Sequence, residues 1–375
     1  MTPRVTALIL IVGSILTSLA VMEIGLRVAG YDATPVVAPD DIRGWSLVPD
    51  RPGITNSQGL RDRERTVAKP AGTVRIAVLG DSMAEGMQVT LPETFPSVLE
   101  TLLNDSACFG APVEVINFAV QGYGTAQQYL TLDQKAWAYD PDVILLAVFP
   151  GNDVRDNARA LKGLDYLPFY TLDQGKLVLD LSFQRRWSYR LRKVGASVVR
   201  HSRLAQGLNR TRFLLKARLR AWSDRRRTQA RGLGEAGIDN LVFMDPAPPE
   251  WESAWQVTEA IIGQMNNDVT ARGRRFVLAV LGTAIEDNPD PEPRAKLAAA
   301  IGVDDLSAPR RRLAKLGLFG KFWVLDLVGT LRREAVRTNT CFHGEPDAPP
   351  CTGHYNPAGH RAAAEMIATQ LCPIG

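Results

Sequence analysis

Short runs of apolar, β-forming residues alternate along the chain with longer segments of helical spacing. The run from Pro141 to Phe149 is almost continuously apolar, as expected of a central parallel strand that is covered on both faces. Each run in the first half ends in a glycine-containing turn, and a helical segment follows. This repeat of strand, loop and helix is typical of a parallel α/β sheet. The other predicted strands begin at Val74 or cover Val113–Ala119, Arg275–Leu281 and Phe322–Leu327, and the predicted helices cover Pro92–Asn104, Ala126–Trp137, Trp251–Ala271 and Pro357–Leu371.

The chain begins with one long apolar segment. Arg4 precedes 18 uncharged residues, from Val5 to Met22, a length between that of a signal-peptide core and that of a thin transmembrane helix. We predict an uncleaved anchor over residues 1–30, because the run is long for a cleaved peptide, and we expect Arg4 on the cytoplasmic side. The remainder would lie outside the cytoplasm, in the periplasm or beyond it, as a single-pass protein of the cytoplasmic membrane. A buried core helix is the alternative.

Residues 31–72 contain several prolines and glycines and show little periodicity, which favours a linker and surface extension. Its polar segment Asn56–Arg61 is expected to lie across the surface of the domain. With 375 residues, 45% of them hydrophobic and 22% charged, the chain is long enough for a sizeable core of ordinary composition. We place the main domain at residues 73–375.

The formal net charge of +4 conceals a strong asymmetry. Residues 184–232 contain 16 Lys and Arg against the single acid Asp224, so this stretch carries +15 and the rest of the chain −11. It belongs to a region, about 160–245, that does not continue the alternation of strands and helices. We predict a basic, amphipathic helical insertion. Its apolar stripe comprises Leu204, Leu208, Leu215, Leu219 and Trp222, with Thr211 as one polar member.

Three interpretations of this insertion stay open. It could be a solvated helix packed on the domain, a surface that contacts anionic lipid headgroups, or a surface that contacts an acidic polymer. Nucleic acid is not an expected partner of an exported protein.

The four cysteines agree with an oxidising compartment. Cys341 and Cys351 lie ten residues apart in a loop-like stretch, which favours a local disulfide and leaves Cys108 to pair with Cys372. Spacing alone does not determine the connectivity. No cysteine and histidine spacing resembles a zinc site, and we expect neither a metal nor an organic cofactor.

The first predicted strand ends in Gly80-Asp81-Ser82, with Gly86 four residues later. This pattern predicts a tight turn that holds the Ser82 hydroxyl at the carboxyl edge of the sheet, above the start of a helix. Open α/β sheets bind ligands at that edge. Taken alone, the pattern also fits a serine that merely caps a helix.

A nucleophilic serine needs a base, and the chain has four histidines. His354 immediately precedes the last predicted helix, on a loop that can reach across the sheet edge, so we select it as the base. His201 belongs to the insertion, His343 lies in the loop near Cys341, and His360 lies in the first turn of the last helix, where packing or capping is expected.

Four blocks of the sequence resemble, in order and spacing, the SGNH/GDSL hydrolase superfamily, and the flanking segments resemble its membrane-anchored bacterial branch. The resemblance covers about residues 50–160 and 250–372 and leaves the basic insertion unexplained. It implies a three-layer α/β/α sandwich with a mostly parallel, flavodoxin-like sheet. The blocks are Gly80-Asp81-Ser82, Asn117 to Gly122, Gly151-Asn152-Asp153 and Gly353-His354 to His360.

The resemblance also implies a role for each of these positions. Ser82 would be the nucleophile and His354 the general base. The oxyanion would be held by the backbone N–H groups of Ser82 and Gly122 and by the side-chain amide of Asn152. An amide offers a neutral donor, and a glycine lets the backbone approach the tetrahedral centre.

One position departs from the family pattern. The aspartate that usually stands two or three residues before the histidine is replaced by Thr352 and Cys351. Three explanations stay open. Asp347, in the same loop, could substitute; a backbone carbonyl could orient His354; or the domain could have lost hydrolysis and kept a binding role.

The sequence thus predicts an exported serine esterase or O-acyltransferase that forms an acyl-Ser82 intermediate. Its expected substrate, as the anchored branch implies, is an acyl ester, above all an acetyl ester, on a glycan of the cell envelope or an exported glycan. One alternative is a non-catalytic glycan-binding or scaffold protein with a degenerate site. Another is a lipid-directed esterase whose basic helix lies on anionic headgroups.

Overall fold

The structure is a computed structural model, and it describes residues 2–231, 235, 238–345 and 349–372. The chain divides into two compact units. The first contains residues 1–39 and 184–231, and the second contains residues 40–183 and 232–375. Each unit is described by itself below.

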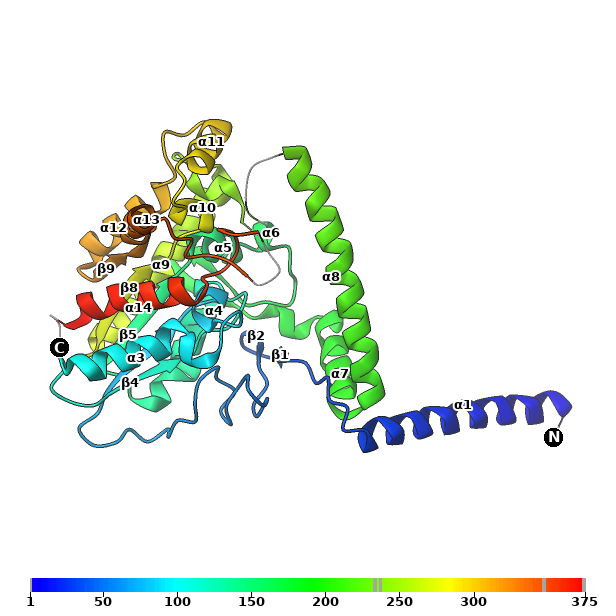
Figure 1. The fold of residues 1–375 in the computed structure, drawn as a ribbon. Coiled ribbons are helices and arrows are strands. Elements are labelled where there is room, and N and C mark those ends of the chain that lie inside the picture. Colours follow the sequence, from blue (N-terminus) through cyan, green and yellow to red (C-terminus); the bar gives the residue numbers. More distant parts are fainter. Residues whose placement is uncertain (1, 232–234, 236–237, 346–348, 373–375) are drawn as a thin grey trace. The chain divides into compact units, whose positions relative to one another are not determined.

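The second unit is built on one sheet of five parallel strands in the order β4-β3-β5-β8-β9 (Figure 1). When these five strands are numbered in chain order, their order across the sheet is 2-1-3-4-5, which is the flavodoxin-like order. The sheet therefore confirms the predicted fold class. The strands are β3 (Val74–Leu79), β4 (Val113–Asn117), β5 (Val143–Val148), β8 (Arg275–Val280) and β9 (Trp323–Asp326).

Alternate residues of each strand point to opposite faces of the sheet, and helices cover both faces (Figure 1). Ile76 and Val78 of β3 pack on one side, against α3 (Phe95–Ser106), α13 (Leu327–Thr338) and α14 (Pro357–Leu371). Ala77 and Leu79 pack on the other side, against α4 (Thr125–Gln134), α9 (Pro249–Ala271) and α12 (Ala308–Gly320). The result is the three-layer sandwich that the sequence predicts.

Three short helices follow the carboxyl ends of the central strands, namely α2 (Ser82–Glu85), α5 (Pro150–Asp156) and α10 (Ala284–Asp287). The second unit also contains an antiparallel hairpin of β6 (Phe169–Asp173) and β7 (Lys176–Asp180). The prediction of a helical insertion from about residue 160 missed this hairpin. Smaller elements are β1 (Val37–Asp40), β2 (Gly44–Leu47), α6 (Arg159–Lys162), α11 (Glu292–Ile301) and 3₁₀ turns at Leu91–Glu93, Ala136–Tyr139, Ser182–Arg185 and Asn240–Phe243.

The first unit consists of three long helices. α1 (Pro3–Val28) is long and apolar enough to cross a membrane or to act as a signal sequence. α7 (Trp187–His201) and α8 (Arg203–Arg231) pack side by side (Figure 1) and carry the basic segment. The helical character predicted for that segment is thereby confirmed.

Only part of the polar segment Asn56–Arg61 lies at the surface, where the prediction placed all of it: Ser57 and Gln58 are exposed, whereas the other residues are buried. Arg61 is only 4% exposed, and its guanidinium donates to the carbonyl oxygen of Val89 at 2.8 Å and to that of Gly86 at 3.3 Å. Because an arginine carries five donors, it can be buried wherever carbonyl groups receive them. The polar composition of this segment therefore did not reveal that part of it, including Arg61, is buried in the domain.

Two disulfides join the four cysteines as the sequence favours. Cys108 pairs with Cys372, with Cα atoms 5.3 Å apart, and links the end of α3 to that of α14. Cys341 pairs with Cys351, with Cα atoms 5.0 Å apart, and closes a ten-residue loop before the last helix.

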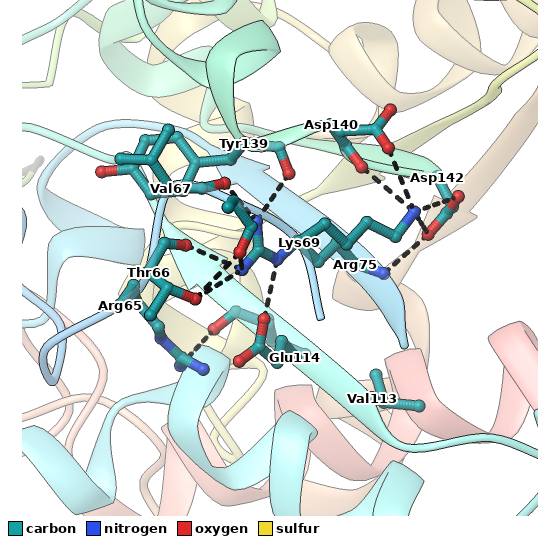
Figure 2. A network of polar contacts seen from close by, with 12 residues as sticks. Arg65, Thr66, Val67, Lys69, Arg75, Val113, Glu114, Tyr139, Asp140 and Asp142 are labelled. Carbon is teal, nitrogen blue, oxygen red and sulfur yellow. Dashed lines mark hydrogen bonds and ion pairs between the residues drawn. The ribbon is translucent and has the colours of Figure 1, made fainter. Parts of the chain in front are cut away.

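At the amino edge of the sheet, the buried side chain of Arg75 lies at the centre of a polar network (Figure 2). Its guanidinium donates to the carbonyl oxygens of Thr66, Val67 and Tyr139, each at 2.8 Å. It also donates to the Glu114 carboxylate at 2.7 Å. One side chain thus ties the segment before β3 and the turn before β5 to the two neighbouring strands.

Asp142 completes this edge (Figure 2). Its carboxylate accepts the backbone N–H of Arg75 at 2.8 Å and the side chains of Lys69 and Arg274 at 2.6 Å and 2.7 Å. The amino ends of three adjacent strands are therefore fixed by charge-assisted hydrogen bonds, which are stronger than neutral ones.

We expect Arg75→Met to lower the free energy of unfolding by about 3–5 kcal/mol, because it leaves a carboxylate and several carbonyl groups without their donor. The matched control is Arg63→Met. The Arg63 side chain is 54% exposed and lies 3.8 Å from the other oxygen of Glu114, so its loss should cost less than about 1 kcal/mol. Urea denaturation followed by circular dichroism measures both, and equally small losses would contradict the role given to Arg75.

Candidate active site

Ser82 stands where β3 ends, as the first residue of α2. The preceding residue, Asp81, caps this helix, since its carboxylate accepts the backbone N–H of Met83 at 2.9 Å. This local bond fixes the turn that brings the serine to the carboxyl edge of the sheet. The Ser82 side chain is partly exposed there.

The His354 ring connects Ser82 to a carboxylate. Its Nε2 lies 2.9 Å from the Oγ of Ser82, and its Nδ1 lies 2.6 Å from the Oε1 of Glu345. With the proton on Nδ1, the ring donates to Glu345 and accepts from the Ser82 hydroxyl. The three groups therefore stand in the order of a serine hydrolase triad.

Glu345 was missed by sequence reasoning, which looked for an acid two or three residues before the histidine. The chain folds back on itself here, since Gly344 donates its N–H to the carbonyl oxygen of His354 at 3.0 Å. Gly353 lies at φ +75°, and a Cβ on it would stand 3.0 Å from Glu345 Oε1. The absence of a side chain at this position thus makes room for the carboxylate.

The Cys341–Cys351 disulfide closes the loop that carries Glu345. The ten-residue cysteine spacing was therefore the signal that could have identified Glu345, because a disulfide across this loop brings its first half back toward His354. The predicted acid Asp347 lies in the same loop but outside the described residues.

Gly122 and Asn152 follow the two strands that flank β3. Because β4, β3 and β5 are adjacent and parallel, the loops after them meet at one edge. Gly122 adopts φ +75°, and a Cβ there would lie 3.2 Å from the ring of Trp45. Trp45 itself donates its indole N–H to the carbonyl oxygen of Gln121 at 3.2 Å. A side chain at position 122 would disturb this contact as well as the backbone.

The side-chain amide of Asn152 lies in the first turn of α5 and donates to the Asp81 carboxylate at 2.8 Å. A primary amide has two N–H bonds, so one remains for a ligand. The adjacent Asp153 accepts the backbone N–H of Phe149 at 2.9 Å. Burial, and after it the charge of Asp81, raises the pKa of Asp153 well above its usual range.

His343 forms a second histidine and carboxylate pair beneath the His354 loop. Its Nδ1 lies 2.8 Å from the carbonyl oxygen of Gly353, and its Nε2 lies 3.0 Å from the carboxylate of Asp287. Burial alone would lower the pKa of His343, but the hydrogen bond and charge of Asp287 outweigh it and raise the pKa. Because the Gly353 carbonyl oxygen can only accept, Nδ1 of His343 donates to it, and this bond holds the backbone next to His354.

The other two histidines lie elsewhere. His360 is buried, its Nδ1 accepts the backbone N–H of Phe95 at 3.2 Å, and burial lowers its pKa to about 3. Its neutral ring therefore caps and packs, as the sequence predicts. His201 is exposed at the end of α7. Among the described residues, no group of three or more His, Cys, Asp and Glu side chains could hold a metal ion.

No protein-family model matches the sequence, and no curated protein matches it. Among solved structures, the chain is similar to an acetyl xylan esterase (11% identity, TM-score 0.43), covering 80% of this chain and 100% of that one. It is also similar to a protein described as lipolytic, of the G-D-S-L family, from Desulfitobacterium hafniense (12% identity, TM-score 0.39, covering 79% and 98%). A third is an acetylxylan esterase from Geobacillus stearothermophilus (10% identity, TM-score 0.41, covering 80% and 94%). Likenesses this distant carry no argument about function, which rests on the residues of this chain.

Glu85 supports the loop that carries Gly122. It is 1% exposed and accepts the backbone N–H of Gln121 at 3.0 Å. Burial raises the pKa of Glu85 to about 7, while Arg61 and the hydrogen bond from Gln121 act in the opposite direction. The Glu85 carboxyl thus binds its proton more tightly in the folded protein than in the unfolded chain.

We expect Glu345→Gln to lower kcat by up to about 10⁴-fold, because a neutral amide neither stabilises the imidazolium nor enforces the tautomer. KM should change little, since Glu345 acts through His354 and is a positioning residue. Glu345→Asp should restore part of kcat, which a merely structural role would not require. Steady-state kinetics on an aryl acetate measure both variants, and unchanged kcat in Glu345→Gln would exclude this role.

Glu85→Gln should stabilise the protein at alkaline pH. Below the ordinary pKa of 4.5 the carboxyl is neutral in both states, between 4.5 and about 7 only the unfolded chain ionises, and above about 7 both do. Wild-type stability therefore falls across this window, and the variant should exceed it above pH 7 by up to about 3 kcal/mol.

The matched control for this pH dependence is Glu93→Gln. Hydrogen bonds from Thr90 hold the pKa of Glu93 below its ordinary value. Its contribution is present above pH 4.5 and is lost as the pH falls, so this variant should be less stable than wild type at neutral pH and equal to it in acid. Urea denaturation at a series of pH values measures both, and parallel curves for the two variants would refute the assignment.

Proposed function

We propose that this protein is a serine ester hydrolase of the SGNH type that acts through an acyl-Ser82 intermediate. The observation that carries the proposal is the continuous contact from Ser82 Oγ through the two nitrogens of His354 to Glu345. Such an arrangement raises the nucleophilicity of a serine hydroxyl at neutral pH.

In the first step, the Oγ of Ser82 forms a bond to the ester carbonyl carbon while its proton moves to Nε2 of His354. The positive charge that develops on the ring is stabilised by Glu345. The carbonyl oxygen becomes an oxyanion, for which the candidate donors are the N–H groups of Ser82 and Gly122 and the free N–H of the Asn152 amide. Losing one such donor costs on the order of 3 kcal/mol in transition-state stabilisation.

In the second step, the carbon–oxygen bond to the leaving alcohol breaks, and the alcohol takes the proton from Nε2 of His354. A water molecule or a sugar hydroxyl then gives its proton to Nε2 of His354 and forms a bond to the acyl carbon. The bond between that carbon and Oγ of Ser82 breaks, and Oγ takes the proton back from His354. Water yields hydrolysis and a free acid, whereas a sugar hydroxyl yields acyl transfer. Both outcomes use the same groups.

For the substrate we propose an acyl ester, above all an acetyl ester, on a glycan of the cell envelope or an exported glycan. The side chains of His354 and Glu345 are 30% and 40% exposed, so the reacting groups can be reached by an ester that is attached to a large polymer. A helix that suits a membrane anchor and two disulfides fit a domain outside the cytoplasm.

Reaction of the full-length protein with a fluorophosphonate probe tests the proposal. The probe should label Ser82, and both Ser82→Ala and His354→Ala should abolish labelling and lower turnover of an aryl acetate by at least about 10³-fold. The matched control is Ser253→Ala, which removes an exposed hydroxyl from α9 and should leave both signals unchanged.

Two results would count against this function. Turnover retained in Ser82→Ala would exclude an acyl-Ser82 intermediate. A folded wild-type protein that neither reacts with the probe nor turns over an ester would instead favour the glycan-binding alternative.

A further inference from the structure

Helix α7 exposes a narrow apolar stripe along one face. Its four members are spaced by four, three and four residues and are each more than half exposed, namely Trp187 (74%), Leu191 (59%), Val194 (61%) and Val198 (54%). On the opposite face, Tyr189 is 2% exposed. The helix therefore packs through one side and presents apolar side chains to the solvent on the other. A helix usually buries its apolar stripe, so exposure of this kind marks a contact surface.

The beginning of α8 has the same character. Leu208, Leu215 and Leu219 follow helical spacing and are 66%, 56% and 66% exposed. The stripe that the sequence predicts is thus present, but these members of it are not buried against the protein. Exposed basic side chains lie beside these stripes, namely Arg190 on α7 and Arg212, Lys216 and Arg218 on α8.

Hydrogen bonds attach the corner between α7 and α8 to the end of α1. The carboxylate of Glu23 accepts the hydroxyl of Ser202 at 2.9 Å and the backbone N–H groups of Arg203 and Leu204 at 3.0 Å and 2.9 Å. Glu23 thus caps α8 from another helix. Arg27 adds a bond to the carbonyl oxygen of His201 at 2.6 Å.

These contacts determine how deep the junction between α7 and α8 would lie relative to a membrane that α1 crosses. The uncharged run of α1 ends at Met22, and Glu23 is the first acid after it. If α1 spans the bilayer, its charged end stands at the interface between acyl chains and water. The corner of α7 and α8 must then stand at the same level, within hydrogen-bond distance of that end.

We propose that α7 and the beginning of α8 form a membrane-surface docking face that binds anionic phospholipids. The apolar stripe of α7 enters the boundary between headgroups and acyl chains, with Trp187 at the level that tryptophan favours. Arg190 beside it, and Arg212, Lys216 and Arg218 beside the stripe of α8, contact lipid phosphates. This proposal does not depend on the esterase function.

The surface chemistry favours lipid over an acidic polymer. A hydrated polyanion would contact the basic side chains, but it would leave Leu191, Val194 and Val198 in water. A bilayer of anionic lipid satisfies both kinds of side chain at once. The bonds to the end of α1 also place this surface beside lipid rather than far from it.

The test uses the full-length protein with one added cysteine, since the four native cysteines are joined in disulfides. Val194→Cys carries an environment-sensitive fluorophore in the stripe, and Leu191→Cys is a second such position. The matched control is Ser197→Cys, an exposed site about a quarter-turn from the stripe on the same helix. The labelled proteins are reconstituted into vesicles of phosphatidylcholine alone or mixed with phosphatidylglycerol.

In the mixed vesicles, the labels at 191 and 194 should shift to the blue and be quenched by lipids that carry a nitroxide near the carbonyl region. The label at 197 should respond less. The response should weaken in phosphatidylcholine alone and at high salt, because it depends partly on charge.

Two outcomes would overturn the proposal. In the first, the labels at 191 and 194 stay in an aqueous environment in both kinds of vesicle, or match the control. In the second, the fluorescence of the same labels shifts to the blue when an acidic polysaccharide is added to the protein in detergent, but it does not shift in anionic vesicles. That result would assign this face to a polymer.

Discussion

The candidate site depends on one constraint, which is that parallel strands present all their carboxyl ends at the same edge of a sheet. In this protein β3 lies between β4 and β5, so Ser82 is flanked by the loops that carry Gly122 and Asn152. Asp81 joins two of these loops, because it caps α2 and also accepts the Asn152 amide. Glu85 joins Ser82's helix to the third. Strand order thus determines which side chains can meet, and buried carboxyl groups determine how they are held.

At the opposite edge of the sheet, charged side chains hold the strands together and do not face a ligand site. Arg75 and Asp142 hold the amino ends of β3, β4 and β5, and the segment before β3 is bound with them. Buried charges are stable only when every donor and acceptor is matched, and here the matching groups come from several parts of the chain. The strands are therefore held at both ends, which keeps the loops of the candidate site in register.

The strands and the fold class could be predicted, because they depend on local patterns in the sequence. The pairing of Ser82 with His354 could be predicted because the chain has only four histidines and because the blocks around both residues resemble a known family. Apolar runs indicate buried strands. A histidine on the loop just before the last helix is expected at the edge of the sheet. Glu345 could not be found in this way, since its distance from His354 is set by a bridge and a disulfide across a loop. Arg61 was misjudged for a related reason: its burial depends on carbonyl groups of residues that are remote in the sequence. The contact between Asp287 and His343 could not be predicted for the same reason, since the two residues are far apart in the sequence and only the folded chain brings them together.

The contact between Ser82 and His354 spans 272 residues of chain. Closing so long a loop comes late in folding, after the nearer strands and helices have formed. Ser82 is synthesised first and His354 much later, so in a partly synthesised chain the Ser82 hydroxyl has no base beside it. The proposed reaction would require α14 to be docked beside α3, where a disulfide joins the two helices. The order of the polypeptide itself would then keep the Ser82 hydroxyl unactivated until the carboxyl-terminal part of the domain has folded.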